Sequence, residues 1–166
     1  MKKYANRSRL WQWNYYLGHP HYRTLLWYRL HEANTGVARR LFGWLYRRSS
    51  LQSGLEILTP RLGGGVIMPH WGRIILNAEE IGEDFYVFHN VTIGHDYRNG
   101  RPRIGRNVFI STGAILIGEI SIGDNVIVGA GSLVNSDVPS NSLVVGNPAK
   151  VVRETDPDEI HRMIGY

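Results

Sequence analysis

The stretch IGRNVFISTGAILIGEISIGDNVIVGAGSLV, residues 104–134, has an aliphatic residue at every sixth position: Ile104, Ile110, Leu116, Ile122, Val128 and Val134. A period of six fits neither an α-helix nor a plain alternating strand. It is typical of a strand of about four residues followed by a turn of about two, where Gly, Asn or Asp accepts the turn dihedrals. Three such units close a triangular coil, and coils stack at about 4.8 Å, the spacing of paired strands.

The same period extends toward the N-terminus through Leu62, Met68, Ile74, Ile81, Val87 and Ile93. It is interrupted by one extra residue after Ile74 and by five extra residues after Ile93. One coil cannot bury its own apolar face, so a repeat of this kind folds only as a stack. We therefore predict a mainly β chain with a parallel β-helix of about five coils over residues 51–153.

Charge divides the 166 residues into two parts. Residues 1–48 hold ten Lys and Arg but one acid, Glu32, for a net charge of +9, whereas residues 49–166 have a net charge of −4. There is no cysteine, which excludes disulfides, thiolate metal ligands and a cysteine nucleophile. We predict a basic helical segment over 1–50, the β-helix over 51–153 and a tail over 154–166.

Helix signals begin at Pro20, where an apolar stripe runs through Tyr22, Leu26, Leu30, Ala33, Val37, Leu41 and Leu45. Asn34-Thr35-Gly36 is expected to break this run into two helices. The simpler interpretation is a helical cap, packed on the β-helix or on another subunit. The alternative is that residues 1–48 rest on an anionic membrane surface. Nucleic acid is not an expected partner, because no recognition motif accompanies the charge.

Neither a transmembrane run of about 18 apolar residues nor a secretory signal is visible in the sequence, so we expect a cytoplasmic protein.

Five short stretches carry a family resemblance: Gly54-Leu55-Glu56-Ile57, Met68-Pro69-His70-Trp71-Gly72, Ile74-Ile75-Leu76-Asn77, Asn90-Val91-Thr92-Ile93-Gly94 and Val144-Val145-Gly146-Asn147-Pro148-Ala149-Lys150-Val151. Together with the repeat, they resemble the hexapeptide-repeat acyltransferases over residues 54–153. The likeness is greatest to serine acetyltransferases and to colanic acid biosynthesis acetyltransferases. It implies a left-handed β-helix, an exception to the usual right-handed crossover. It also implies a homotrimer and acetyl-CoA as the acyl donor.

His70 matches the family's catalytic histidine, and Glu56 matches the acid that orients it. A neutral imidazole would take a proton from the acceptor hydroxyl as that oxygen attacks the thioester. His95, on the loop made by the five-residue insertion, is the alternative base.

The resemblance places coenzyme A between neighbouring β-helices. Thr112 and Ala130, one coil apart, match positions that meet its pantetheine arm, and Lys150 and Arg153 are candidates for its phosphates.

The acceptor follows from two departures from the serine acetyltransferase pattern. Pro69 stands where those enzymes have Asp, and Arg101 stands where they have a second His. We therefore predict a sugar hydroxyl in cell-surface polysaccharide assembly, contacted by Trp71, His89, His95, Asp96 and Arg101. The alternatives are L-serine as acceptor and a non-catalytic trimeric scaffold or membrane-docked module. No metal site is expected, because His70, His89 and His95 lack the ligand spacing of zinc-dependent β-helices.

Overall fold

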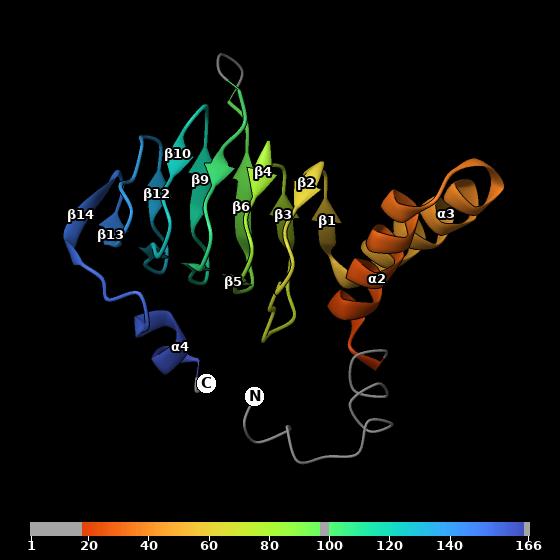
Figure 1. Cartoon of the computed structure of the whole chain (residues 1–166), viewed down its shortest axis with the longest axis horizontal. Coiled ribbons are helices and arrows are strands. Elements are labelled where there is room, and N and C mark those ends of the chain that lie inside the picture. Colours follow the sequence, from red (N-terminus) through yellow and green to blue (C-terminus); the bar gives the residue numbers. More distant parts are fainter. Residues whose placement is uncertain (1–17, 97–99, 165–166) are drawn as a thin grey trace.

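A computed structural model describes residues 18–96 and 100–164. Two helices, α2 (Pro20–Ala33) and α3 (Gly36–Ser53), precede a stack of short strands (Figure 1). The strands form three flat faces of one prism, and all pairings are parallel except the last, β13 with β14. The predicted left-handed parallel β-helix of about five coils is confirmed.

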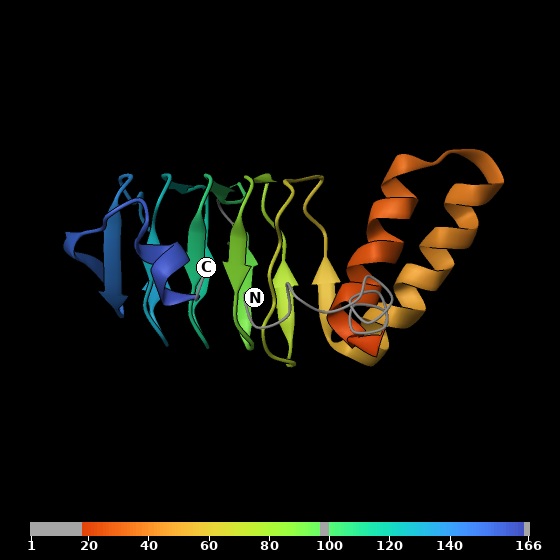
Figure 2. The same ribbon diagram turned by 60° about the horizontal axis from the view of Figure 1, so that its bottom comes forward.

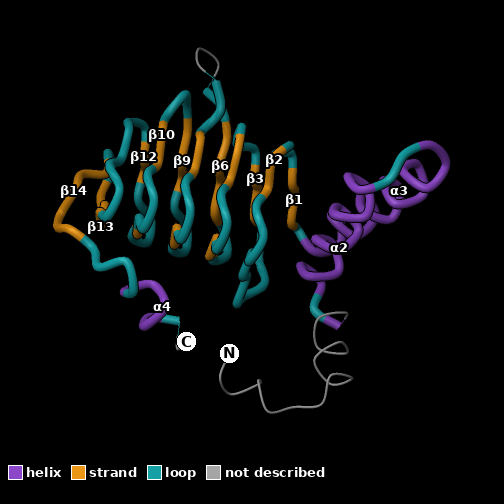
Figure 3. Tube along the Cα trace, viewed as in Figure 1, coloured by secondary structure: helices purple, strands orange, loops and turns teal. Residues whose placement is uncertain are grey.

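Each face takes one strand from each coil. Face A contains β1 (Leu55–Ile57), β3 (Ile74–Leu76), β6 (Val91–Gly94), β9 (Ile115–Ile117) and β12 (Leu133–Val134). Face B contains β2 (Arg61–Leu62), β4 (Glu80–Ile81), β7 (Arg103–Ile104) and β10 (Ser121–Ile122). Face C contains β5 (Phe85–Val87), β8 (Val108–Ile110), β11 (Ile127–Val128), β13 (Ser142–Gly146) and β14 (Ala149–Glu154). A last short helix, α4 (Glu159–Met163), follows (Figure 3).

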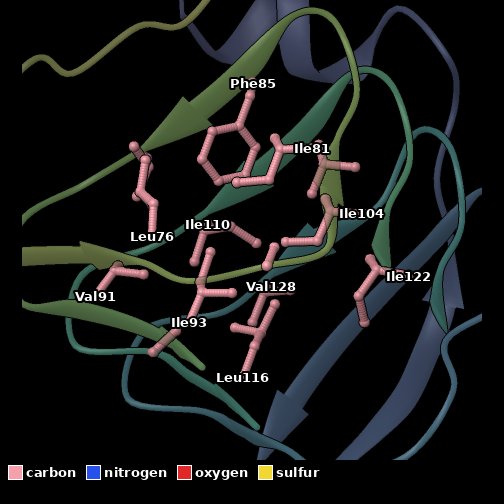
Figure 4. Close-up of a cluster of buried hydrophobic side chains, with 14 of the residues drawn as sticks. Leu76, Ile81, Phe85, Val91, Ile93, Ile104, Ile110, Leu116, Ile122 and Val128 are labelled. Atoms are coloured by element: carbon pink, nitrogen blue, oxygen red, sulfur yellow. The ribbon is translucent and has the colours of Figure 1, made fainter. Parts of the chain in front are cut away.

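The six-residue period produces the core directly. Ile93 pairs with Leu116 across adjacent coils, and Ile110 pairs with Val128. These side chains point into the prism and are essentially inaccessible to solvent (Figure 4). Stacked aliphatic layers of this kind bury most of the apolar surface of the repeat, which is why the stack is stable only as a whole.

Close coil stacking explains two recurring turn residues. A Cβ on Gly123 would lie 2.4 Å from the backbone nitrogen of Ser140, so only glycine fits between these coils. At the same corner, Asn107, Asn125 and Asn141 all adopt positive φ, near +55°. Their amides form a ladder, with Nδ2 of Asn107 donating to Oδ1 of Asn125 at 2.9 Å and Nδ2 of Asn125 donating to Oδ1 of Asn141 at 2.8 Å.

The helices form an antiparallel hairpin on the first coil (Figure 2). Tyr28 closes the open end by donating its hydroxyl to the carbonyl of Thr59 at 2.6 Å. Tyr46 bonds both to the carbonyl and to the N–H of Ile57, at 2.8 and 2.7 Å, in place of a preceding coil. The predicted break between two helices is confirmed.

The predicted apolar stripe is wrong for α3. Its members Val37 and Leu41 are 83% and 54% exposed, whereas Ser49 is buried. The hairpin packs through small polar groups instead, because Oγ1 of Thr24 hydrogen-bonds Oγ of Ser49 at 2.7 Å and Oγ of Ser53 at 2.9 Å. Periodicity located the helices but not the face that each one buries.

The outer surfaces of the three faces differ. Face C is covered by α4, whose Ile160 is buried against Tyr86, Phe109 and Ile127. Face B presents charge, including the ion pair between Arg61 and Glu80 at 3.2 Å. The outer side of face A is largely apolar and is not covered by a helix within the described residues; it consists of Glu56, Ile75, Thr92, Ile115 and Leu133.

Among the described residues, no helix has the length and apolarity that crossing a membrane would require.

Candidate active site

Segments 68–72, 88–90, 111–113 and 129–131 each connect face C to face A, and they stack along one edge of the prism, which we call the CA edge. The N–H of Gly113 donates to the carbonyl of His89 at 3.2 Å, and the N–H of Gly131 donates to the carbonyl of Thr112 at 2.9 Å. His70, His89, Thr112 and Ala130 therefore follow one another along a single edge. Residues predicted to hold the base and the coenzyme arm share this line.

The His70 side chain is exposed on the CA edge. Its ring lies 5.3 Å from the ring of Phe88 and 5.9 Å from that of His89, which stands nearly perpendicular to it. Within 18–96 and 100–164, the His70 imidazole has no hydrogen-bond partner. Such a ring is open to an incoming hydroxyl, but nothing in the described part of one chain selects its tautomer.

Glu56 is not joined to His70 by a hydrogen bond or ion pair within the described residues. It lies on the outer side of β1, where it lines a groove of about 950 Å³ between α3 and the first coil, together with Trp44, Arg47 and Leu58. The family resemblance implied that the two side chains meet. Their pairing stays a prediction.

The start of α2 holds the segment that carries His70. Nε1 of Trp71 donates to Nε2 of His19 at 2.7 Å, and the N–H of Met68 donates to the hydroxyl of Tyr22 at 3.2 Å. His21 is buried beside this segment, with Nε2 at 3.0 Å from the carbonyl oxygen of Ser53. The segment that carries His70 is thus fixed from outside the β-helix.

Burial lowers the pKa of His19, and the nearby His21 lowers it further. Burial also lowers the pKa of His21, although backbone carbonyls, first that of Ser53, partly oppose the shift. Sequence reasoning missed both histidines. The available signal was His-Pro-His at a helix start, which does not reveal that a coil corner about 50 residues away packs against it.

The other predicted acceptor residues lie on a different edge. His95, Asp96 and Arg101 follow face A and precede face B, on what we call the AB edge. His95 is exposed and Asp96 is half-buried, while residues 97–99 of the predicted loop lie outside the described residues. Trp71 and His89 are on the CA edge, so one chain does not gather all five residues.

Arg101 is engaged within the β-helix. Nη2 and Nε donate to Oε1 of Glu79 at 2.8 and 3.2 Å, and Nη1 lies 3.4 Å from Oδ1 of Asn77. The guanidinium lowers the pKa of the Glu79 carboxyl. Arg101 therefore has a structural task at this corner, so its presence in place of a histidine is weak evidence about the acceptor.

The four residues predicted to contact coenzyme A lie on different parts of the chain's surface. Thr112 and Ala130 lie on the CA edge, where Gly113 and Gly131 leave the backbone approachable. Lys150 is exposed on β14. Arg153 instead holds α4, donating to both carboxylate oxygens of Glu159 at 2.5 and 2.9 Å.

Comparison with known proteins identifies the family. Residues 101–136 match the model of the bacterial transferase hexapeptide (six repeats). A serine acetyltransferase of Helicobacter pylori is 34% identical over 150 residues, which are 85% of this chain and 86% of that protein. Similar solved structures include a Neisseria gonorrhoeae serine acetyltransferase in complex with serine, with 30% identity and a TM-score of 0.68. Another is a Brucella abortus serine acetyltransferase in complex with coenzyme A, with 26% identity and a TM-score of 0.63.

These solved structures are longer proteins. The match covers 92% of this chain but 64% of the Neisseria chain, and 84% of this chain but 55% of the Brucella chain.

The relatives contradict the predicted sugar acceptor and its place in polysaccharide assembly, since the named relatives are serine acetyltransferases. The prediction gave too much weight to Pro69 and Arg101, because Arg101 forms an ion pair with Glu79. A non-catalytic scaffold is likewise not supported. The predicted enzyme class and the acetyl-CoA donor are confirmed. The repeat, the left-handed β-helix and the match along most of a curated relative agree, and the chain belongs to the serine acetyltransferase family of acetyl-CoA-dependent O-acetyltransferases.

Proposed function

We propose that the chain transfers the acetyl group of acetyl-CoA to the hydroxyl of L-serine, giving O-acetyl-L-serine and free coenzyme A. The observation that carries the proposal is the exposed His70 imidazole on the CA edge, in a chain whose relatives are serine acetyltransferases. A relative solved with serine and another solved with coenzyme A support the two substrates.

His70 is the proposed general base. Its neutral imidazole takes the proton of the serine hydroxyl as that oxygen attacks the thioester carbonyl. The carbon–oxygen bond forms, and the resulting tetrahedral oxyanion collapses with cleavage of the carbon–sulfur bond. The imidazolium then returns the proton to the departing sulfur, so the enzyme ends unchanged. The chain has no cysteine to carry the acetyl group, which fits direct transfer.

We propose that the working form is a homotrimer packed through face A. Face C is covered by α4 and face B is charged, whereas Ile75, Ile115 and Leu133 leave the outside of face A apolar. An uncovered apolar sheet favours association.

Packing through face A around a threefold axis sets the CA edge of one chain beside the AB edge of the next. His70 and Trp71 then face the loop with His95, Asp96 and Arg101 of a neighbour. Glu56, which projects from face A, approaches the same cleft and stays the proposed orienter of His70. Thr112, Ala130 and Lys150 are the proposed coenzyme contacts along this cleft.

The test measures whether the purified protein releases coenzyme A only when an acceptor is present. A thiol reagent detects the free coenzyme A, and mass spectrometry identifies O-acetylserine. We expect release with L-serine and much less with D-serine, which has the same hydroxyl with inverted geometry. The matched variant is His70→Asn, which keeps size and polarity but removes the base. Thiol release that does not depend on L-serine would contradict the proposal.

A further inference from the structure

Helix α3 carries a row of exposed apolar side chains, of which Trp44 and Leu51 also border the groove beside the first coil. Val37 is 83% exposed, Leu41 54%, Trp44 60% and Leu51 84%. Spacings of four, three and seven residues place all four side chains on one side of an α-helix. Four large apolar groups in a row are more than the scattered exposed residues of an ordinary surface.

This exposure does not come from loose packing of the hairpin. The opposite side of α3 is tied to α2, because Thr24 hydrogen-bonds Ser49 and Ser53, and the ring of Phe42 stacks on Trp27 at 6.2 Å and 17°. Ser49 and Ser53 of α3 thus face α2, and the four exposed apolar residues lie on another side of the helix. Figure 2 shows the two helices of the hairpin beside each other.

The same face is strongly basic. Arg40, Arg47 and Arg48 flank the apolar row, and α3 contains no acidic residue. Within the part of the chain that the structure describes, none of these three arginines forms an ion pair, whereas Arg39 is paired with Glu32 at 3.5 Å. Residues 1–17 contain four further Lys and Arg and no acid, so they offer no neutralising charge.

The charge decides which occupant fits. A second copy of α3 would bring three uncompensated arginines against three others, which opposes association. An anionic lipid surface supplies negative headgroups and an apolar layer directly below them. Tryptophan and arginine suit that boundary, because the indole is amphipathic and the long arginine stem lets the charge reach the headgroups. A helix with these two features lies in the plane of the interface.

We propose that the outer face of α3, formed by Val37, Leu41, Trp44 and Leu51 with Arg40, Arg47 and Arg48, docks the protein on anionic lipid surfaces. The proposal is independent of the acetyl acceptor. It gives a physical use to the +9 charge of residues 1–48, which the transfer chemistry does not need.

The test is flotation of the full-length protein with vesicles of phosphatidylcholine alone and with about 30 mol% phosphatidylglycerol. We expect recovery with the anionic vesicles only, and a strong fall in recovery at high salt. The variant Leu41→Ser/Trp44→Ser should lower the partition coefficient at least about tenfold, because it removes much of the apolar area that α3 would insert into the lipid. The variant Arg40→Gln/Arg47→Gln/Arg48→Gln should do so through lost electrostatic attraction.

The control is Val151→Ser/Val152→Ser, which removes two exposed apolar residues from β14 at the far end of the solenoid. It should bind like the parent. All variants alter exposed side chains, and acetyl transfer in solution confirms that they are folded.

Equal recovery with neutral and anionic vesicles would overturn the proposal, as would parental binding by Leu41→Ser/Trp44→Ser. The proposal would also be overturned if the parent protein bound no vesicles and instead formed a larger assembly that the Leu41→Ser/Trp44→Ser variant dissociates. That result would assign the face to contacts between copies of the chain.

Discussion

The indole Nε1 of Trp71 donates a hydrogen bond to Nε2 of His19 at 2.7 Å, although the two residues are 52 positions apart. An indole nitrogen is only a donor, so Nε2 of His19 must be unprotonated. The contact therefore requires a neutral His19. It joins the helical hairpin to the residue next to His70, and this makes the geometry of the proposed base depend on the N-terminal segment.

Stability should consequently fall in mild acid. The pKa of His19 and that of His21 lie below 6.5 in the folded state, whereas the unfolded chain protonates near 6.5. From about pH 6.5 downward the unfolded state binds more protons, so the free energy of unfolding decreases until the folded pKa values are passed. Urea unfolding between pH 5 and 8 measures this dependence.

In the double variant His19→Gln/His21→Gln, the decrease below pH 6.5 should be smaller than in the parent. His95→Gln is the matched control, because His95 is exposed on the AB edge, and its profile should follow the parent. Identical pH profiles for all three proteins would contradict the role assigned to the buried pair.

The same contact predicts an effect on catalysis. Trp71→Phe keeps an aromatic ring but removes the donor to His19, so the 68–72 segment loses one of its ties to α2. We expect a lower kcat with a smaller change in KM for acetyl-CoA, because Thr112 and Ala130 lie in other coils. Steady-state kinetics with both substrates tests this. An unchanged kcat would show that the tie does not position His70.

His70→Asn should lower kcat about 10²–10⁴-fold, the usual contribution of a general base. The fold should persist, because the side chain is exposed and the ring makes no hydrogen bond with another described residue. Thiol release measures the rate and circular dichroism the fold. His95→Asn serves as the comparison: if it, and not His70→Asn, abolishes transfer, the base is on the AB edge.

Ile160→Ala should destabilise the protein by about 2–4 kcal/mol, as for other large-to-small changes at buried aliphatic positions. Ile160 is 1% exposed and seals α4 on face C, whereas Met163 in the same helix is 53% exposed. Met163→Ala should thus change the free energy of unfolding little. Equal effects of the two substitutions would show that α4 does not depend on this contact.

Gly123→Ala should destabilise by about 2 kcal/mol or more, because its Cβ would meet the backbone of Ser140 at 2.4 Å and a backbone cannot move aside cheaply. Gly64 offers the control, since nothing lies within 4 Å of a Cβ built there. Gly64→Ala should change stability by less than about 1 kcal/mol. Thermal unfolding of both variants gives the comparison.

Much of the architecture could be predicted because the signal was local and repeated. Each hexad from Leu62 to Val134 favours a short strand followed by a turn, and stacking of the coils makes these local preferences reinforce one another. The helix break at Asn34-Thr35-Gly36 was local as well. The acceptor was inferred from Pro69 and Arg101 alone, and such isolated differences did not reveal that Glu79 already holds Arg101.

The sequence by itself determined the β-helix, its period, its number of coils and the stacking of Ala130 one coil after Thr112, since residues a whole coil apart must stack. Only the tertiary structure decided which face α3 buries, that α4 covers face C, and that His19 accepts from Trp71. The physical reason is that a repeat specifies contacts with its own next turn. Contacts between the repeat and the segments that flank it depend instead on side-chain packing across long separations, where Thr24 and Ser49 outweighed an apolar stripe.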